Sequence, residues 1–266
     1  MSNRRNVYLF YRKSKEMIER IQLLKTLASD HDFHIVDDMK EANIIIGIGG
    51  DGAFLQAVRK TGFRDDCLYA GIATSDQLSF YCDFHIDNTE KIIEAMKTAN
   101  LEVRRFPVIE VQFDNDPSFY CLNECSIRSS VIKAFSMDVF INENYFETFR
   151  GDGMVISTPT GSTAYNKSLN GAVVDPLLPC MQVSEIASLN NNNYRTLGSS
   201  FILSSENTLT LKLQPDNSHW PTIGIDNEAL SAKQIEQIRI NLSNRQVKTL
   251  KLKDNSFWQR VQRTFL

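Results

Sequence analysis

Asp51 is the residue whose type and surroundings point most directly to chemistry. It lies within the turn Gly49–Gly52, directly after the β-branched apolar run from Ile44 to Ile48. Glycines let a backbone approach a ligand closely, and the helix predicted to follow offers unpaired N–H groups to an anion. A carboxylate there repels a bare phosphate, so it is expected to bind through Mg²⁺ or to accept a hydrogen bond or a proton from a hydroxyl that becomes phosphorylated.

A structural role for the same turn is the alternative. The glycines can form a tight strand-to-helix connection with Asp51 as the N-cap of the helix. No G-K-S/T sequence follows the glycines, so the turn is not a Walker-type phosphate loop. No G-x-G-x-x-G sequence occurs in the context that a Rossmann dinucleotide fingerprint requires.

A second group of candidate residues lies in Phe149–Gly153 and Ser157–Asn166, which are rich in hydroxyls, glycines and turn formers. Such a loop can donate several hydrogen bonds to a ribose or a phosphate, and Tyr165 can stack on a base. Asn123 and Glu124 interrupt an apolar strand, where an amide and a carboxylate can hold two vicinal ribose hydroxyls. Composition equally allows a β-turn with a Ser/Thr-rich helix cap, and a polar pair on the solvent face of an edge strand.

Composition favours a compact globular protein of one or two domains. The chain has 266 residues, 42% of them hydrophobic and 23% charged, with a net charge of −3. It has no long basic run, so no nucleic-acid partner is expected, and no apolar stretch or leader that suggests a membrane or secretion. Its five cysteines lack disulfide or zinc spacing, which predicts reduced thiols, no metal-ligand set and a cytoplasmic location.

Strands alternate with helices over the first hundred residues, which predicts a Rossmann-like open α/β sheet. The predicted strands are 7–11, 33–36, 44–48 and 68–73. The predicted helices run from a cap at Ser14 to about Ser29, over 53–58, and from Asp87 to about Ala99. Ligands on such sheets bind at the carboxyl ends of the strands, where Gly49–Gly52 and the loop 73–80 are placed.

From Leu101 onwards, short alternating runs separated by turns predict a mostly antiparallel, β-sandwich-like domain. The predicted strands are 103–113, 119–127, 137–142, 155–157, 201–203, 208–213, 235–242 and 247–252. Residues 256–266 return to helical spacing and are expected to pack on the first domain. The expected organisation is therefore an α/β domain over 1–100, a β-rich domain over 101–254 and a returning helix over 255–266.

The order of these motifs resembles that of the NAD kinase family, whose bacterial members phosphorylate NAD to NADP. The resemblance rests on G-G-D-G at 49–52, L-N-E at 122–124, F-R-G-D-G at 149–153 and S-T-P-T-G-S-T-A-Y-N-K-S at 157–168. It extends from about Asn43 to the end of the chain. G-G-D-G alone is shared with diacylglycerol-type lipid kinases and phosphofructokinases, but these lack the long 157–168 stretch.

The resemblance implies a β-rich NAD-binding domain, a homo-oligomer (tetramer or dimer) and a phosphate donor that is ATP or polyphosphate with Mg²⁺ or another divalent cation. It implies that Asp51 orients or deprotonates the 2′-hydroxyl of the adenosine ribose. Gly49, Gly50 and Gly52 would form the loop for the donor. The residues implied for NAD are Gly52, Phe80, Asn123, Glu124, Arg150, Asp152, Thr160, Thr163, Ala164, Tyr165, Ser168 and Ala187.

Some of these residues carry specific roles by resemblance. Phe80 would pack on the adenine, and Asn123 with Glu124 would hold the nicotinamide-side ribose. Asp152 would lie near the nicotinamide end, contributed across a subunit interface. Tyr165 would lie against a ring.

The sequence departs from the family pattern in three places. Ala53 replaces the usual Thr after G-G-D-G, the loop 71–80 is one residue longer and gains Asp76, and Asn227 replaces a frequent His. These changes suggest a divergent member. The alternatives are a catalytically weak NAD(P)-binding regulator on the same fold, or a lipid or sugar kinase of the same superfamily.

Overall fold

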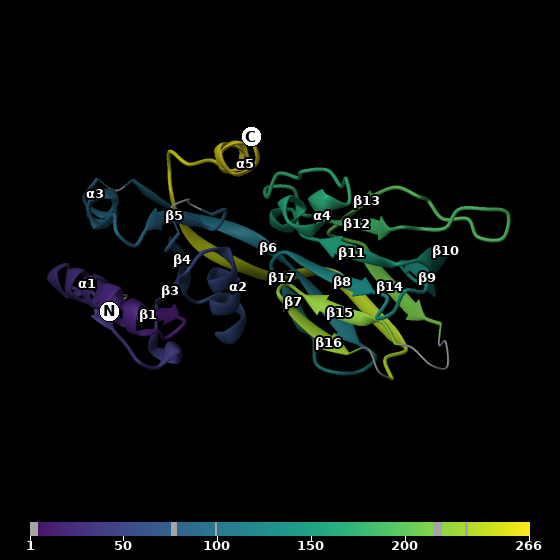
Figure 1. The fold of residues 1–266 in the computed structure, drawn as a ribbon, viewed down its shortest axis with the longest axis horizontal. Helices are drawn as coiled ribbons and strands as arrows, with labels where there is room; N and C mark the ends of the chain where they lie inside the picture. The colour runs from purple at the N-terminus through teal and green to yellow at the C-terminus, as the bar shows by residue number, and fades with distance from the viewer. Residues whose placement is uncertain (1–4, 76–78, 99, 215–219, 232–233) are drawn as a thin grey trace. The chain divides into compact units, whose positions relative to one another are not determined.

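The computed structural model describes residues 5–75, 79–98, 100–214, 220–231 and 234–266, and the chain forms two compact units (Figure 1). The first unit comprises Met1–Phe106 and Gln246–Leu266, and the second comprises Pro107–Arg245. Residues 246–254 therefore group with the first unit, whereas the sequence-based boundaries put them in the β-rich domain. Within the described residues, no helix is both long enough and apolar enough to cross a membrane.

The first unit is built on a parallel sheet in the order β2-β1-β3-β4, with β5 beside β4. The bounds are β1 (Asn6–Tyr11), β2 (His34–Ile35), β3 (Ile44–Ile48), β4 (Leu68–Ala73) and β5 (Cys82–His85). The end of β17 (Gln237–Leu252) joins β4 through the pair Thr249 and Tyr69. The predicted open α/β sheet is confirmed, and β5 is an addition that the sequence pattern did not indicate.

Helices α1 (Lys15–Asp30), α2 (Asp51–Lys60), α3 (Thr89–Lys97) and α5 (Phe257–Phe265) belong to this unit, with a short 3-10 turn over Met39–Glu41. The Oγ atom of Ser14 accepts from the Met17 N–H at 3.2 Å, as predicted. Helix α3 is capped by Asn88, whose side chain accepts from the Lys91 N–H at 3.1 Å, and not by Asp87, whose carboxylate pairs with Arg20 at 2.7 Å.

The C-terminal helix α5 packs on the first unit, which confirms the predicted return of the chain. The ring of Phe257 lies 5.6 Å from that of Phe80, and Arg263 donates to the Ser79 carbonyl at 3.2 Å. A capping box formed by Ser256 and Gln259 fixes the start of this helix.

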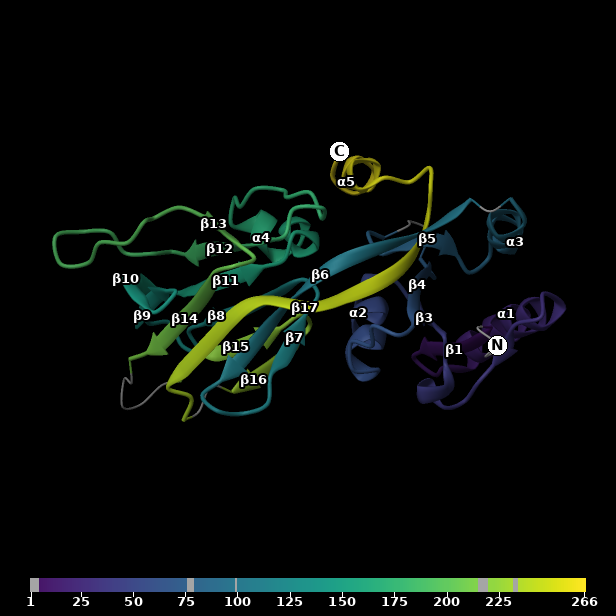
Figure 2. The ribbon, with the colours of Figure 1, turned by 180° about the vertical axis from the view of Figure 1, so that it is seen from behind.

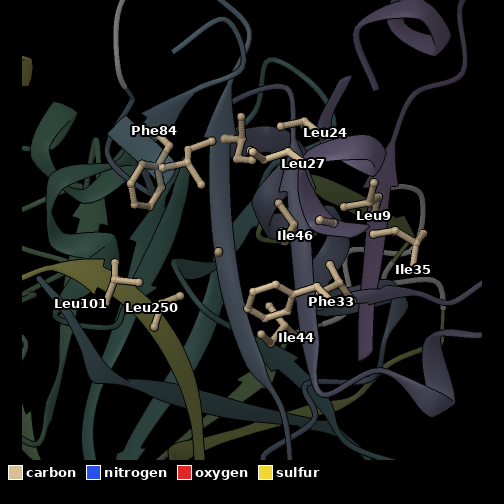
Figure 3. Close-up of a pocket in the computed structure, with 15 residues that line it drawn as sticks. Leu9, Leu24, Leu27, Phe33, Ile35, Ile44, Ile46, Phe84, Leu101 and Leu250 are labelled. Carbon is tan, nitrogen blue, oxygen red and sulfur yellow. The ribbon is translucent and has the colours of Figure 1, made fainter. Parts of the chain in front are cut away.

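An apolar cavity of about 120 Å³ lies in the core of the first unit (Figure 3). Two helices contribute to its wall, with Leu24 and Leu27 from α1 and Ile92 from α3. The remaining lining residues are Val7, Leu9, Ala28, Phe33, Ile35, Ile44, Ile46, Ala70, Ile72, Phe84, Leu101 and Leu250. All of these side chains are apolar, so the wall of the cavity offers almost no polar group to a ligand.

The second unit is a sandwich of two mostly antiparallel sheets. One contains β10 (Asn144–Gly151), β9 (Phe135–Ile141), β14 (Thr208–Leu213) and β17, with β6 (Leu101–Phe113) and β7 (Phe119–Cys121). The other has the order β13 (Phe201–Ser204), β12 (Cys180–Ile186), β11 (Gly153–Ser157), β8 (Glu124–Arg128), β15 (Thr222–Ile225) and β16 (Glu228–Ser231). Side chains of both sheets, such as Val139 and Ile156, share one buried core, as expected for a β-sandwich.

Two predicted strand boundaries in this unit are wrong. The expected strand 119–127 is interrupted between β7 and β8, because the Asp226 carboxylate accepts the N–H groups of residues 122–124. The expected strands 235–242 and 247–252 are one continuous strand, β17, which Figure 2 shows along its whole length. Strands β10, β12, β15 and β16 are further additions.

Candidate active site

The glycine turn at the end of β3 has the backbone that the sequence predicts. Gly49 and Gly50 have φ angles of 135° and 103°, which strain any residue with a Cβ atom. A Cβ atom on Gly47 would lie 2.9 Å from the Cα atom of Phe54, so this glycine lets α2 pack against β3. The turn therefore brings the N-terminus of α2 directly to the carboxyl end of a central parallel strand.

Asp51 is the first residue of α2, and its carboxylate does not cap the helix. The N-cap is Gly50, which has no side chain to donate or accept. The Asp51 Oδ2 atom accepts from the Phe80 N–H at 2.9 Å, and the Oδ1 atom accepts from the Tyr81 N–H at 2.6 Å. The N-cap alternative is therefore wrong, and the carboxylate is instead fixed by two amides of a different segment.

The segment that holds Asp51 is anchored on both sides by rings. The ring of Tyr81 stacks on Phe54 of α2, with centroids 4.7 Å apart and planes 7° from parallel. Phe80 is 5% exposed, and the Arg260 guanidinium lies 5.4 Å from its ring centroid. Phe80 is thus part of the core of the first unit, and its contact with an adenine stays a prediction.

A pocket of about 500 Å³ lies at the carboxyl ends of β1, β3 and β4, where ligands bind to open α/β sheets. Gly49, Gly52 and Ala53 line it, which places two of the three predicted donor-loop glycines on its wall. It is lined further by Phe10, Tyr11, Arg12, Ser14, Met17, Ile48, Gln56 and Thr74.

Among the polar members of this pocket, Thr74 belongs to the loop 73–80 that the sequence places at the strand ends, and Ser14 was expected only as a helix cap, whereas Arg12 and Gln56 were not indicated by any motif. Arg12 directly follows a strand end, so the position of the strands was the signal that would have identified it. Residues 76–78 of the altered loop, including Asp76, lie outside the described residues.

In the second unit, Asn123 and Glu124 lie at the interruption between β7 and β8. The Oδ1 atom of Asp226 accepts from their N–H groups at 2.7 and 3.2 Å, and its Oδ2 atom accepts from the Leu122 N–H at 3.0 Å. Asp226 has a φ of 51° in the turn between β15 and β16. Its side chain is thus a main-chain anchor for both candidate residues, a role that the sequence motifs did not indicate.

Glu124 is a buried carboxyl group with an unusual proton affinity. Burial raises its pKa to about 8, the nearby Asp226 carboxylate adds to this effect, and a hydrogen bond with the Tyr165 backbone opposes it. Its Oε2 atom is buried without a hydrogen-bond partner among the described residues. At neutral pH the side chain is therefore mostly a neutral acid, which can both donate and accept a hydrogen bond.

The hydroxyls of the Ser/Thr-rich loop after β11 mainly form hydrogen bonds that stabilise the loop and its contact with the backbone near Leu122. Thr158 and Thr160 both donate to the Leu122 carbonyl, at 2.6 and 3.1 Å, and Thr163 donates to the Thr160 carbonyl at 3.1 Å. A Cβ atom on Gly161 would lie 2.0 Å from the Asn123 oxygen, so the loop is packed on the backbone of Asn123. The predicted O–H donation to a ligand by these buried threonines is therefore not available in this state.

The loop continues into the short helix α4 (Tyr165–Ser168), where three further candidate residues lie. Ala164 and Tyr165 are half-buried, and the Arg128 guanidinium lies 5.6 Å from the centroid of the Tyr165 ring. Ser168 is exposed. The structure brings Tyr165 together with Glu124, since its backbone contributes to the proton affinity of that carboxyl.

Arg150, Asp152 and Ala187 form a third cluster in the second unit. The Asp152 N–H donates to the Ile186 carbonyl at 3.0 Å, and a Cβ atom on Gly151 would lie 2.9 Å from the Ala187 carbonyl. The Arg150 guanidinium lies 4.9 Å from the Tyr194 ring centroid, while the Asp152 side chain is exposed. Ala187 has a φ of 46° and is exposed.

Across the described part of the chain, no three His, Cys, Asp or Glu side chains gather in a way that could hold a metal ion. The groups at the glycine turn that could coordinate a metal ion are instead a single carboxylate, main-chain groups and hydroxyls. This composition suits a divalent cation that keeps most of its ligands on phosphates and water.

Comparisons with solved structures define the class of the fold. The chain superimposes on a yeast NADH kinase complexed with NADH with a TM-score of 0.78 and 18% identity, covering 98% of this chain and 87% of the other. It superimposes on an NAD kinase from Archaeoglobus fulgidus in complex with ATP with a TM-score of 0.78 and 19% identity, covering 97% and 98%. The fold is therefore that of the NAD and NADH kinases.

Sequence comparisons identify the family. The model for the ATP-NAD kinase C-terminal domain matches residues 122–252. The chain is 60% identical to NAD kinase 2 of Bacillus anthracis over 267 residues, which is 100% of both chains. It is 61% identical to NAD kinase 2 of Bacillus subtilis (strain 168) over 263 residues, covering 99% of this chain and 98% of the other. The chain belongs to the NAD kinase family.

Proposed function

We propose that this protein phosphorylates the 2′-hydroxyl of the adenosine ribose of NAD to give NADP, with ATP as the donor. Family membership supports the activity, since close relatives over the full length carry the name NAD kinase 2. The observation that carries the assignment of the site is the Asp51 carboxylate, fixed by two amides in a glycine turn beside a pocket.

In this proposal Asp51 acts on the acceptor hydroxyl. Its carboxylate accepts the hydroxyl proton as the ribose oxygen forms a bond to the γ-phosphorus of ATP. The bond from that phosphorus to the bridging oxygen breaks, and ADP leaves. A positioned carboxylate contributes about 10²- to 10⁴-fold to such a step, and the rest comes from holding the two substrates in line.

The phosphates of the donor would lie in the pocket lined by Gly49, Gly52 and Arg12. Main-chain N–H groups at the start of the ten-residue helix α2 and the Arg12 cation both favour an anion there. Mg²⁺ or another divalent cation would be held by the phosphates and would neutralise their charge in the transfer. Polyphosphate presents the same chemistry as an alternative donor.

Residues of the second unit would bind NAD. Asn123 and the neutral acid Glu124 present an amide and a carboxyl to two vicinal ribose hydroxyls, and Tyr165 presents a half-buried ring to a base or nicotinamide. We propose the same function for Gly52, Phe80, Arg150, Asp152, Thr160, Thr163, Ala164, Ser168 and Ala187. The buried threonines would act by shaping the loop through their internal hydrogen bonds.

We also propose a cytoplasmic homo-oligomer, either a tetramer or a dimer. All five cysteines are free and buried, which suits a reducing compartment. The second unit exposes large apolar side chains, among them Ile132, Leu177, Leu178 and Ile202, and such residues favour association. Light scattering after size-exclusion chromatography measures the oligomer directly.

The test of the reaction is product analysis with the purified chain. Incubation with NAD, ATP and Mg²⁺ should give NADP, identified by a phosphorus resonance of a 2′-phosphomonoester, with one ADP for each NADP. Ala53 on the pocket wall favours the alternative of a weakly catalytic regulator. NAD that binds without turnover would establish that alternative, and turnover of a lipid or sugar without turnover of NAD would assign the chain to a related kinase.

A further inference from the structure

Lys251 is a buried charged group that the proposed reaction does not use. It lies on β17 and is 1% exposed. Burial lowers its pKa, and the nearby Asp83 carboxylate opposes this effect. A lysine at such a position costs free energy through desolvation, and apolar residues of similar volume often replace a buried ion pair without loss of stability. The contacts of its ammonium group indicate what it does instead.

The ammonium group is held between a carboxylate and a main-chain carbonyl. Its Nζ atom lies 3.7 Å from the Asp83 Oδ1 atom and donates to the Tyr81 carbonyl at 2.5 Å. Asp83 is itself fixed, because its carboxylate accepts from the Leu252 N–H at 2.9 Å and from the Asn255 side-chain amide at 2.7 Å. Lys251 therefore cannot change its position without breaking an ordered buried network.

Tyr81 connects this network to Asp51. Its carbonyl accepts from Lys251, and its N–H donates to the Asp51 Oδ1 atom at 2.6 Å. Its carbonyl also packs on β4, since a Cβ atom on Gly71 would lie 2.5 Å from that oxygen. The backbone of one residue thus links a buried lysine, 170 positions away in sequence, to the carboxylate at the glycine turn.

We infer that Lys251 is a positioning residue for Asp51. By holding the Tyr81 carbonyl it orients the adjoining backbone, so that the N–H groups of Phe80 and Tyr81 point at the carboxylate and fix its rotamer. The inference rests on the proposed function of Asp51. Displacing a base by about 1 Å lowers the rate about 100-fold without a matching loss in substrate binding. Removing Lys251 should therefore lower kcat and leave KM nearly unchanged.

The first test compares Lys251→Met with Lys251→Arg and with the matched control Lys253→Met. Methionine keeps the apolar stem and removes the donor, whereas arginine keeps the positive charge and the donors. Lys253 is two positions further along the chain and is exposed. We expect Lys251→Met to lower kcat by about 10- to 100-fold, with KM values for NAD and ATP within about twofold. Lys251→Arg should recover part of kcat, and Lys253→Met should leave it unchanged.

A double variant protects the test against misfolding. Lys251→Met alone removes one of two buried cations, Lys251 and Arg260, that interact with the Asp83 carboxylate, and this loss can destabilise the chain. Lys251→Met combined with Asp83→Asn removes both charges together, and it is compared with Asp83→Asn alone. The double variant should show a lower kcat than Asp83→Asn, since only the single variant keeps the bond from Lys251 to Tyr81.

Amide hydrogen exchange gives a readout that does not depend on turnover. Exchange at Phe80 and Tyr81 should accelerate by at least about tenfold in the variants that lack Lys251, and not in Lys253→Met. Unchanged exchange at these two amides, or an unchanged kcat in the double variant, would overturn the inference. Absence of NADP formation by the wild-type protein would instead reject the proposed function, while the exchange measurement would still decide the positioning role.

Discussion

The Asp226 carboxylate lies 2.7 Å from the main-chain nitrogen of Asn123, and it also accepts from the N–H groups on either side. A single side chain from the turn after β15 therefore fixes the interruption at which both ribose-binding candidates are placed. Replacing it should affect the stability of the second unit and the binding of NAD together.

Asp226→Asn should destabilise the protein by about 2–4 kcal/mol, because the two carboxylate oxygens accept from three N–H groups and an amide has only one acceptor oxygen. The KM for NAD should rise and the KM for ATP should change little. Urea unfolding and steady-state kinetics measure both effects. Asp254→Asn, at an exposed position, is the control. An Asp226→Asn protein with wild-type stability would show that the three N–H groups do not need this carboxylate.

Glu124 should behave as a neutral acid at pH 7, because burial and Asp226 raise its pKa to about 8. Glu124→Gln should therefore keep the KM for NAD within about threefold at pH 7, since an amide reproduces the donor and acceptor of a protonated carboxyl. Glu124→Ala should raise that KM about tenfold through the loss of a hydrogen bond of about 1.4 kcal/mol. Equal losses in the two variants would mean that the charged carboxylate binds NAD.

Glu147 should make the stability of the folded protein change with pH. Burial raises its pKa to about 7, the neighbouring Glu185 adds to this, and a bond from the Leu197 N–H opposes it. The folded protein therefore holds this proton more tightly than the unfolded chain, whose value is near 4.5. The stability that this proton provides is present below pH 4.5 and is lost as the pH rises to about 7.

Glu147→Gln removes this titration. The melting temperature of the variant relative to wild type should increase between about pH 5 and pH 8, by about 2–5 °C. Thermal unfolding at several pH values measures the difference. A constant difference across this range would show that Glu147 titrates normally in the folded protein.

Much of the first unit could be predicted from local sequence, whereas the contacts that fix its site could not. The β-branched run before the glycines predicts β3, and Ser14 predicts the start of α1, because both signals lie within a few residues. The partners of Asp51 come from a segment 29 to 30 positions away, and Lys251 lies 170 positions from Tyr81. Such pairs follow from tertiary packing and leave no periodicity in the sequence.

The second unit was predicted less completely for a related reason. Strands β7 and β8 are predicted as one strand because their alternation continues through Leu122, whereas in the structure Asp226 and Thr158 bond to the backbone at this point. The hydroxyls of 158–163 were recognised as a candidate binding motif, but composition does not indicate whether Thr158 bonds to a ligand or to the Leu122 carbonyl.

Filling the apolar cavity should stabilise the first unit. Ala70→Val adds two carbon atoms at the cavity wall, worth about 1–2 kcal/mol of buried apolar surface. Ala73→Val makes the same change on the same strand at a fully buried residue outside the cavity, and overpacking there should cost about 1–3 kcal/mol. Urea unfolding of both variants should give shifts of opposite sign. Destabilisation by both would mean that the cavity closes in solution.

The central claim is that Asp51 acts on the acceptor hydroxyl and not merely as part of the fold. The most direct measurement is the single-turnover rate of NADP formation by Asp51→Asn, with NAD and ATP affinities measured on the same preparation by calorimetry. We predict a rate at least about 100-fold below wild type with both affinities within about threefold. A rate within about threefold of wild type, with both substrates bound normally, would contradict the claim.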